Sequence, residues 1–536
     1  MSVSPWAEAL QSHSWRRPAL IAFVVLVLTV TYQLLIKPKA RTKFPVWATL
    51  EVALTSYLLD QKAQGRRVLS ALRRNDGSLF GLTSWHQLLV DPPQVDRLMA
   101  HAAGSITAAP VQYTLMTRVF GNPDSPEFEK KFFSSWKELN APVEKLFLND
   151  TAATAALERA RILEKANSFV TFTTDRSLMK HWERSADIKV TSSDGVKKVE
   201  ASLQSLSRDF GACVAIPQLY GQDFMERYPQ VLDDLWKFDN DLFPLMMIGI
   251  PEWAPLRAVR EGRAARSRIM TEIEGLYRRI DQHQHGKPID FDADMSDISD
   301  VALGRSTVYE KHGWTLPERG ACDLAIFWGQ NANTQPVVFW LLAYVYSTPG
   351  LLAQIREEIV PYANNSTSGE LTALDIPSIS KNCQLLKACV FETYRLVVEV
   401  TSIRHVTRPI TLTDGERKHE LKSGSFFSAP LSLVNHDASV YRDPDVFDPT
   451  RFLEQNDASG KPVARYGKLK PWGSGAAMCK GRTFAEKEIM VLGAAIVAAW
   501  DIEPESGKWE LPAMVPGTGA KKPVRDIRVA ISRRKL

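Results

Sequence analysis

Residues 471–482 read Pro-Trp-Gly-Ser-Gly-Ala-Ala-Met-Cys-Lys-Gly-Arg, and this stretch decides what the chain folds around. Gly473 and Gly475 allow tight backbone turns shortly before Cys479. Apolar residues at helical intervals follow and predict a helix over residues 482–500. Cys479 therefore comes just before a helix start, where free backbone N–H groups and the positive end of the helix dipole stabilise a thiolate.

The motif alone leaves three roles open for this cysteine. A thiolate held in a dry pocket can bind a haem iron on its proximal side. The second role is that of a buried structural cysteine in a glycine-rich turn. The third is that of a nucleophile, which needs a histidine and an orienting partner; the remaining motifs supply neither.

Helices and a few strands are predicted on the amino-terminal side of the motif. The spacing of apolar residues predicts a long helix over residues 317–346 and a second helix over residues 382–398. Residues 401–413, rich in β-branched side chains, and residues 425–434 are typical of strands. We therefore expect a mainly α fold with a smaller β region, an α+β arrangement.

The first half of the chain favours helices. Residues 50–320 read mainly as helices, interrupted by loops such as Ser-Ser-Asp-Gly at 192–195. The segment after residue 50 contains no linker that is long or flexible enough to divide domains. Residues 51–536 are therefore expected to form a single catalytic domain.

Three charged residues precede the cysteine in a fixed order. Glu392 and Arg395 lie three residues apart on one face of the second helix, and Arg451 follows in the loop sequence Pro-Thr-Arg-Phe at 449–452. A Glu–Arg pair at this spacing is usually solvated and contributes little to stability. The order of these charges ahead of Cys479 gives the pair its significance.

The chain resembles the cytochromes P-450, the haem-thiolate monooxygenases, whose three signatures occur here in the same order. The resemblance implies the cytochrome P-450 fold, and it makes Cys479 the axial ligand of the iron in haem b (iron protoporphyrin IX). It also implies that Glu392, Arg395 and Arg451 form a buried salt-bridge network beneath the haem. Because burying charges is expensive, such a network serves to fix geometry more than to add stability.

The resemblance also assigns residues that contact the cofactor. Trp472, Gly473 and Gly475 match the cysteine motif of the family, although Trp472 stands where phenylalanine is commoner. Arg404 matches a position that contacts a haem propionate. The family's other propionate-binding arginine, two residues before the cysteine, is replaced by Ala477.

Two further residues are weaker candidates for this part of the site. His405 is the neighbour of Arg404, and Trp136 lies in an early helix where a family tryptophan often meets a propionate. The alternative for Trp136 is an ordinary packed aromatic residue.

The long helix carries the candidate catalytic residues. Where the family has an acid and a threonine that feed protons to bound oxygen, this chain has Ala332 and Asn333, followed by Thr334. The resemblance makes Asn333 and Thr334 the replacements for that relay. Pro336 has no N–H for the carbonyl of Ala332, so the helix is expected to open here. The alternative is that Asn333 and Thr334 only satisfy backbone groups in the kinked helix.

The local phrases place the chain near one branch of the family. Ala-Asn-Thr-x-Pro-x-x-Phe-Trp at 332–340 is similar to the sterol 7α-hydroxylases. The Pro-Trp-Gly and Gly-Ser-Gly-Ala pieces of the cysteine motif resemble the branch that holds this enzyme and prostacyclin synthase.

The amino end predicts a membrane anchor. Residues 18–36 contain no charge, and about 20 apolar residues are needed to cross a bilayer as a helix. A short segment, residues 1–17, precedes them, and the basic connector at 37–50 follows. The excess of positive charge after the stretch favours a single-pass protein of the endoplasmic reticulum membrane with a cytosolic catalytic domain. The glycosylation sequons are then expected to go unused; they lie at Asn149, Asn364 and Asn365.

Composition excludes several classes of protein. The 66 basic and 61 acidic residues leave a net charge of only +5, so no nucleic-acid partner is expected. Five cysteines, with no Cys-x-x-Cys pair and no zinc-type spacing, argue against a disulfide scaffold. The body of the protein is therefore expected in a reducing compartment.

The resemblance implies an oxidoreductase of class EC 1.14, a monooxygenase. Such an enzyme uses dioxygen and two electrons from NADPH, delivered by NADPH–cytochrome P-450 reductase. The anchor and the branch suggest a lipophilic small-molecule substrate, such as a sterol, a terpenoid or another polycyclic metabolite, in fungal secondary metabolite biosynthesis. Two alternatives are a haem-thiolate isomerase acting on a peroxide without reductase, and a non-catalytic membrane-bound binding protein.

Overall fold

A computed structural model gives the fold of most of the chain. The residues it describes are 79–83, 86–89, 92–100, 104–193, 195–289, 295–455, 460–515 and 519–535. The expected anchor at 18–36, the segments at 1–17 and 37–50 and the first part of the catalytic domain lie outside these residues. Among the described residues no single helix has the length and apolar character of a membrane span, although one helix pair bent by 112° meets those two criteria together.

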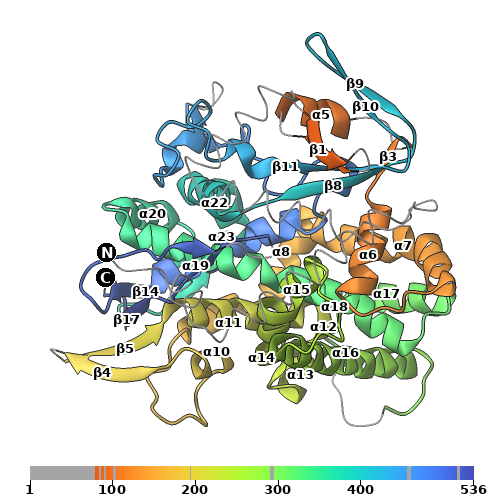
Figure 1. Cartoon of the computed structure of the whole chain (residues 1–536). Helices are drawn as coiled ribbons and strands as arrows, with labels where there is room; N and C mark the ends of the chain where they lie inside the picture. Colours follow the sequence, from red (N-terminus) through yellow and green to blue (C-terminus); the bar gives the residue numbers. More distant parts are fainter. Residues whose placement is uncertain are drawn as a thin grey trace, which may run out of the picture.

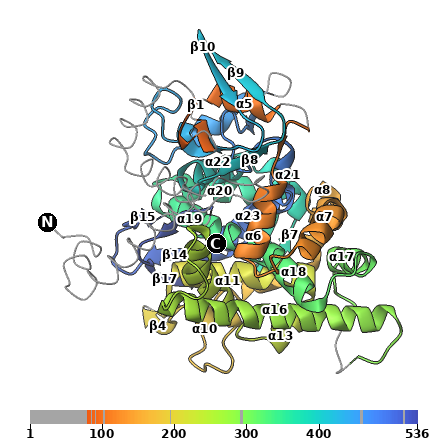
Figure 2. The same cartoon turned by 45° about the vertical axis from the view of Figure 1, so that its right-hand side comes forward.

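Helices dominate the described part, which confirms the expected mainly α fold with a smaller β region. The helices that form the centre of the molecule are α11 (Leu203–Ala215), α18 (Leu316–Ala332), α19 (Thr334–Ser347), α22 (Gln384–Val397) and α23 (Arg482–Ala499). Helix α19 is buried along its whole length except its last residue, and packs against α11, α22 and α23. Figures 1 and 2 show α16 (Arg257–Gln284) on the side of the molecule opposite a hairpin formed by β9 (Ile410–Asp414) and β10 (Arg417–Leu421).

The long helix predicted over residues 317–346 is two helices. Thr315 caps the first with a capping box, and its helical hydrogen bonding stops at Ala332. Asn333 lies between the two, and α19 begins at Thr334. Because Pro336 cannot donate to the carbonyl of Ala332, the opening occurs where the sequence predicts it.

The largest sheet has five strands in the order β1-β2-β11-β8-β3, where β1 is Leu79–Thr83, β2 is His86–Leu89 and β3 is Ile106–Thr107. Strand β8 (Thr401–Val406) pairs antiparallel with β11 (Phe426–Pro430), and Arg404 stands opposite Phe427. The strand-like region predicted over 401–413 forms two strands, because the chain leaves this sheet before Pro409, which has no N–H to donate. Residues after it form a separate hairpin of β9 (Ile410–Asp414) and β10 (Arg417–Leu421).

A second sheet joins distant parts of the chain. Its order is β14-β17-β5-β4, with β4 (Lys189–Ser193), β5 (Val196–Ser202), β14 (Trp500–Pro504) and β17 (Arg528–Arg533). Only a loop at 192–195 was predicted from the sequence, whereas the residues on either side pair as the antiparallel hairpin of β4 and β5. Figure 1 shows this hairpin beside the carboxyl-terminal strands.

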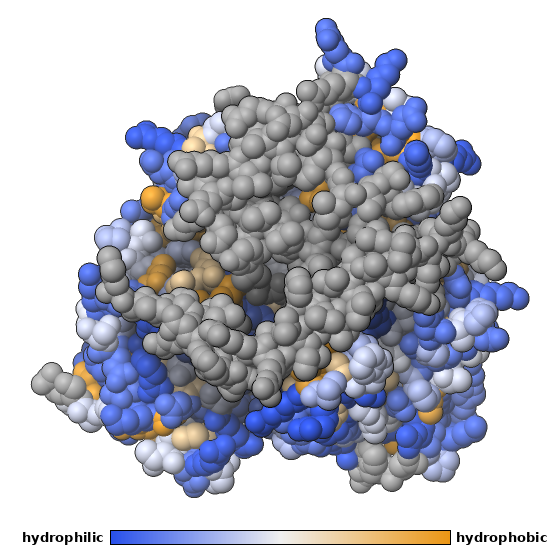
Figure 3. All heavy atoms as spheres, viewed as in Figure 1, coloured by the Kyte–Doolittle hydropathy of each residue, from blue (hydrophilic) through white to orange (hydrophobic). Residues whose placement is uncertain are grey.

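The surface is mostly polar where it can be followed. In Figure 3, hydrophilic side chains cover most of the coloured face, and hydrophobic residues show only in small separate areas. The apolar side chains instead form one large buried cluster that extends through the helices, and a smaller one beneath the five-stranded sheet. The functional site lies where the central helices meet that sheet.

Candidate functional site

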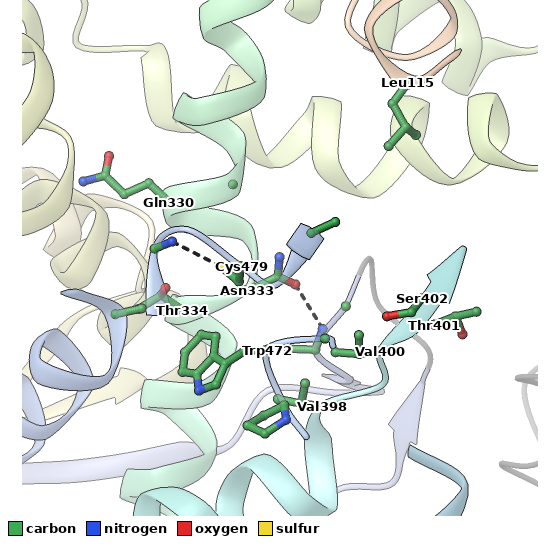
Figure 4. Close-up of a pocket in the computed structure, with 18 of the residues that line it drawn as sticks. Leu115, Gln330, Asn333, Thr334, Val398, Val400, Thr401, Ser402, Trp472 and Cys479 are labelled. Atoms are coloured by element: carbon green, nitrogen blue, oxygen red, sulfur yellow. Dashed lines mark hydrogen bonds between the residues drawn. The ribbon is translucent and has the colours of Figure 1, made fainter. Parts of the chain in front are cut away.

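A cavity of about 600 Å³ lies between the break in the long helix and the cysteine loop. Its walls are mostly apolar. Among the residues that line it are Gly329, Asn333, Thr334, Val400, Arg404 and Cys479. Figure 4 shows the side chains around this space, with Thr334 and Asn333 at the break in the long helix. Val400 lies just before β8, and Thr401 and Ser402 are the first residues of that strand.

The cysteine loop is closed by its own backbone. Cys479 N donates a hydrogen bond to the carbonyl oxygen of Trp472 at 2.8 Å. Gly473 and Gly475 have φ angles of +84° and +70°, which L side chains rarely adopt. A Cβ at Gly475 would also lie 3.1 Å from the carbonyl oxygen of Met99. Both glycines are therefore required by the shape of the loop.

Cys479 is an exposed residue whose side chain opens onto the cavity, where the neighbouring protein groups still limit the access of water to the sulfur. Burial raises the pKa of this thiol, and the Gly481 N–H, Arg482 and Lys480 lower the pKa by less. Gly481 N donates to Sγ at 3.4 Å (Figure 4). The predicted help from the helix start is present, but burial outweighs it. A cation bound at Sγ is what would hold this cysteine as a thiolate.

The donor set fits haem. Among the residues that the structure describes, no group of three or more His, Cys, Asp or Glu side chains could hold a metal ion. A single thiol in a mostly apolar cavity suits a metal that brings its other ligands with it, as the iron of protoporphyrin does. Arg404 adds a cation to the lining, and a mostly apolar cavity of about 600 Å³ can accept an apolar ring system.

Arg404 is nearly buried and held by backbone carbonyls. Its Nη2 donates to the oxygen of Ser474 at 2.7 Å and its Nη1 to the oxygen of Ile403 at 2.8 Å. Burial lowers the pKa of this guanidinium. Because these carbonyls are neutral, the positive charge remains available to an anionic group in the cavity, such as a propionate.

The three charged residues predicted from the sequence come together. Arg395 donates from Nε and Nη2 to the two carboxylate oxygens of Glu392, each at 2.7 Å, and both side chains are fully buried. Arg451 Nε lies 3.1 Å from Glu392 Oε1, which also accepts from Asp448 N. Arg395 Nη1 reaches the carbonyl oxygen of Asn435 at 2.6 Å. The network ties α22 to the loop that precedes the cysteine.

Asn333 is tied to a segment far along the chain. Its Oδ1 accepts a hydrogen bond from Ala520 N at 3.1 Å, shown as a dashed line in Figure 4. A Cβ at Gly519 would collide with the same oxygen. Because Oδ1 is engaged, the Nδ2 donor is the part of the amide left for the cavity. Thr334 also lines the cavity and is 6% exposed.

The weaker candidates lie elsewhere. Trp136 stacks on Phe132 with ring centroids 4.6 Å apart and packs against the main core, as an ordinary aromatic residue does. His405 lies against Phe426 in the sheet, and burial lowers its pKa.

Trp472, by contrast, lines the cavity and donates from Nε1 to the hydroxyl of Tyr466 at 2.9 Å.

Glu488 belongs to the site but was not predicted from the sequence. This residue on α23 lines the cavity and is 0% exposed, and neither carboxyl oxygen has a hydrogen-bond partner among the described residues. Burial raises the pKa of Glu488 to about 8. The available signal was a carboxylate directly before the apolar run Ile-Met-Val-Leu at 489–492, where charge is uncommon.

The chain is similar in sequence to known cytochromes P-450. A family profile described as cytochrome P-450 matches residues 218–524. Cytochrome P-450 monooxygenase poxD of Penicillium oxalicum is 26% identical over 55% of this chain and 56% of its own length. Cytochrome P-450 7B1 of Mus musculus is 24% identical over 74% of this chain and 75% of its own. The 25-hydroxycholesterol 7-alpha-hydroxylase of Rattus norvegicus is 23% identical over 54% of this chain and 68% of its own length.

The extent of these matches differs. The chain spans just over half the length of the fungal relative. A crystal structure of a cytochrome P-450 superimposes with a TM-score of 0.59 and 17% identity, over 88% of this chain and 97% of that one. This likeness shows the same fold over most of the chain.

Proposed function

The chain belongs to the cytochrome P-450 family, and on this premise we propose that it is a haem-dependent monooxygenase. In this reaction one atom of dioxygen enters a C–H bond of a lipophilic small molecule, and NADPH supplies two electrons through NADPH–cytochrome P-450 reductase. The observation that carries the proposal is the single sulfur of Cys479 facing a mostly apolar cavity, opposite the opened helix.

The predicted site residues each have a role in this proposal. Haem bound at Cys479 supplies the activation of dioxygen. Cys479 holds the iron, Arg404 orients the cofactor edge, and the apolar walls bind the substrate and exclude water. The Nδ2 of Asn333 and the hydroxyl of Thr334 donate hydrogen bonds where the helix opens. The Glu392 network keeps the loop beneath the cysteine in place.

The substrate proposal is a sterol, a terpenoid or another polycyclic metabolite, in secondary metabolite biosynthesis. Two observations support it: the cavity is mostly apolar, and relatives include a protein named as a 25-hydroxycholesterol 7-alpha-hydroxylase and a fungal monooxygenase. The uncharged stretch at 18–36 and the basic residues after it support attachment to the endoplasmic reticulum membrane, with the catalytic domain cytosolic.

The first experiment is a carbon monoxide difference spectrum of the reduced full-length protein. We expect the strongly red-shifted Soret band that marks a thiolate on ferrous haem. Cys479→Ala should lose this band, whereas Cys213→Ala, at a buried cysteine on α11, should keep it. Folded protein that binds no haem would overturn the proposal and favour the non-catalytic binding protein.

Asn333 favours one alternative, an isomerase that rearranges a peroxide without reductase. An amide donor stands where the family usually has threonine, and such a donor can bind a peroxide oxygen without passing on a proton. The two activities are separated by turnover of candidate substrates with and without NADPH and reductase. Product that appears only with both supports the monooxygenase.

A further inference from the structure

A chain of hydrogen bonds leads away from the cysteine loop. Trp472 accepts a backbone hydrogen bond from Cys479 and donates from its indole Nε1 to the Tyr466 hydroxyl at 2.9 Å. That hydroxyl donates to Glu486 Oε2, and Lys387 Nζ lies 2.9 Å from the other oxygen of Glu486. The donors point outward from Trp472 to Tyr466 and from Tyr466 to Glu486, and Glu486 accepts from Tyr466 on one oxygen and from Lys387 on the other.

The chain connects the cavity with the surface. Trp472 lines both the cavity that contains Cys479 and a second, more polar pocket of about 540 Å³, which Tyr466 and Glu486 also line. Tyr466 borders a third pocket of about 340 Å³. The side chains of Glu486 and Lys387 are 19% and 24% exposed. Solvent therefore reaches the outer end, while the inner end adjoins the candidate haem site.

These residue types have a chemistry in common. Tryptophan and tyrosine are the side chains that lose one electron most readily without breaking a bond. An oxidised phenol is a strong acid, so tyrosine oxidation requires a base at its hydroxyl, and the Glu486 carboxylate is in that position. Burial, and then Glu486, raise the pKa of Tyr466, so the phenol keeps its proton until it is oxidised.

The rings around the pair also favour electron transfer. The Tyr394 ring meets Trp472 edge-on at 5.1 Å, and Phe391 stacks on Tyr466 at 3.9 Å. These contacts hold both rings in fixed positions.

We propose that Trp472 and Tyr466 form a one-electron relay, which gives the protein a second activity: reduction of hydroperoxides at the haem site by thiols at the surface. The proposal rests on the proposed function, because the oxidant must react inside the cavity. The relay would also remove oxidising equivalents when no substrate is present to consume them.

The steps balance. Trp472 gives one electron to the oxidant in the cavity. Tyr466 then gives one electron to Trp472 and its proton to Glu486. A thiol at the surface restores Tyr466 by supplying one electron, while Glu486 returns the proton and the thiol's own proton is released. Two passes convert one hydroperoxide, with two protons, to an alcohol and water, and two thiols to one disulfide and two protons.

The test uses full-length, haem-loaded, substrate-free protein mixed with an organic hydroperoxide and frozen within milliseconds. Electron paramagnetic resonance should show a tyrosyl radical. Tyr466→Phe should remove that signal, leave a tryptophanyl signal and bleach the haem several-fold faster. Glu486→Gln should lower the tyrosyl yield several-fold. Tyr362→Phe, at a tyrosine that lines none of these three pockets, is the matched control and should change nothing.

A structural role for the hydrogen bond predicts a different result. If Tyr466 only holds Trp472 in place, Tyr466→Phe will shift the spectrum of the bound haem but leave the radical signal and the bleaching rate unchanged. An unchanged tyrosyl signal in Tyr466→Phe overturns the relay.

A second measurement separates the relay from the proposed function. Pulse radiolysis with azide radicals oxidises tryptophan in haem-free full-length protein, and the tyrosyl band should then grow as the tryptophanyl band decays. Tyr466→Phe should remove a distinct phase of that growth, and Tyr362→Phe should not. Loss of this phase together with a failed carbon monoxide spectrum would overturn the proposed function alone, and an unchanged trace would overturn the relay alone.

Discussion

At the scale of single residues, the buried charges beneath the cysteine loop differ in how they are satisfied. Glu392 accepts hydrogen bonds from two arginines and a backbone N–H. Glu488, also fully buried, has no hydrogen-bond partner among the described residues. The first carboxylate is stabilised by its surroundings, and the second is destabilised whenever it is charged.

Glu392→Ala should strongly destabilise the fold. The substitution leaves the guanidinium of Arg395 buried without its counter-ion, and breaking a buried pair in this way costs about 3–5 kcal/mol. The measurement is urea unfolding followed by circular dichroism. Glu454→Ala is the control, because Glu454 is 63% exposed and lies 3.9 Å from an exposed Arg465. Equal midpoints for both variants would contradict the structural role of the network.

Glu488 should make stability depend on pH. Its pKa in the folded protein is about 8, above the ordinary value of 4.5, so the folded state keeps a proton that the unfolded state loses. The contribution of Glu488 to stability is therefore greatest below pH 4.5 and falls by up to about 1.4 kcal/mol per pH unit as the pH rises toward 8. Urea titrations at several pH values should show a shallower slope for Glu488→Gln, and identical slopes would contradict the assignment.

At the scale of elements, the break between α18 and α19 shapes the roof of the cavity. Pro336 removes one helical hydrogen bond, and Asn333 uses the gap to bind the backbone of Ala520. The break is therefore held open from two sides, one within the helix and one from a distant segment. Close packing of α19 against α11 is possible because Gly211 leaves room for the buried side chain of Gln335.

Pro336→Ala should close this break. A proline inside a helix costs roughly 3 kcal/mol or more, so restoring the N–H should raise the melting temperature. The closed turn would also draw Asn333 away from Ala520, and turnover with NADPH and reductase should fall about tenfold or more. A variant that is more stable and fully active would show that the opened turn is not needed for the reaction.

The sequence predicted features that depend on local chemistry. Pro336 identified the opened turn. The Asp-Gly pair at 414–415, which is typical of turns, lies between β9 and β10, and Gly415 has a φ of +60°. The β4–β5 hairpin was missed because its pairing partner β17 lies far along the chain. The engagement of Asn333 with Ala520 and the isolation of Glu488 also depend on segments that only the fold brings together.

At the scale of the whole molecule, the second sheet closes the chain on itself. Strand β17 pairs with β14 on one side and with β5 on the other. Removing residues 528–536 should therefore separate β14 from β5 and take the buried side chains of Val529 and Ile531 out of the core. We expect insoluble or strongly destabilised protein, measured by soluble yield and melting temperature.

A shorter deletion provides the control. Removing residues 535–536 leaves all of β17 in place and should change the melting temperature little, since the strand ends at Arg533. If the longer deletion were equally well tolerated, the carboxyl-terminal strand would not be part of the stable core.

The position of β17 also orders events during biosynthesis. Residues 189–202 leave the ribosome early, but their neighbour β17 is the last of the described strands to be translated. At about 5–20 residues per second, the hairpin waits on the order of tens of seconds with one edge unpaired. Chaperones have that interval in which to act on the open edge.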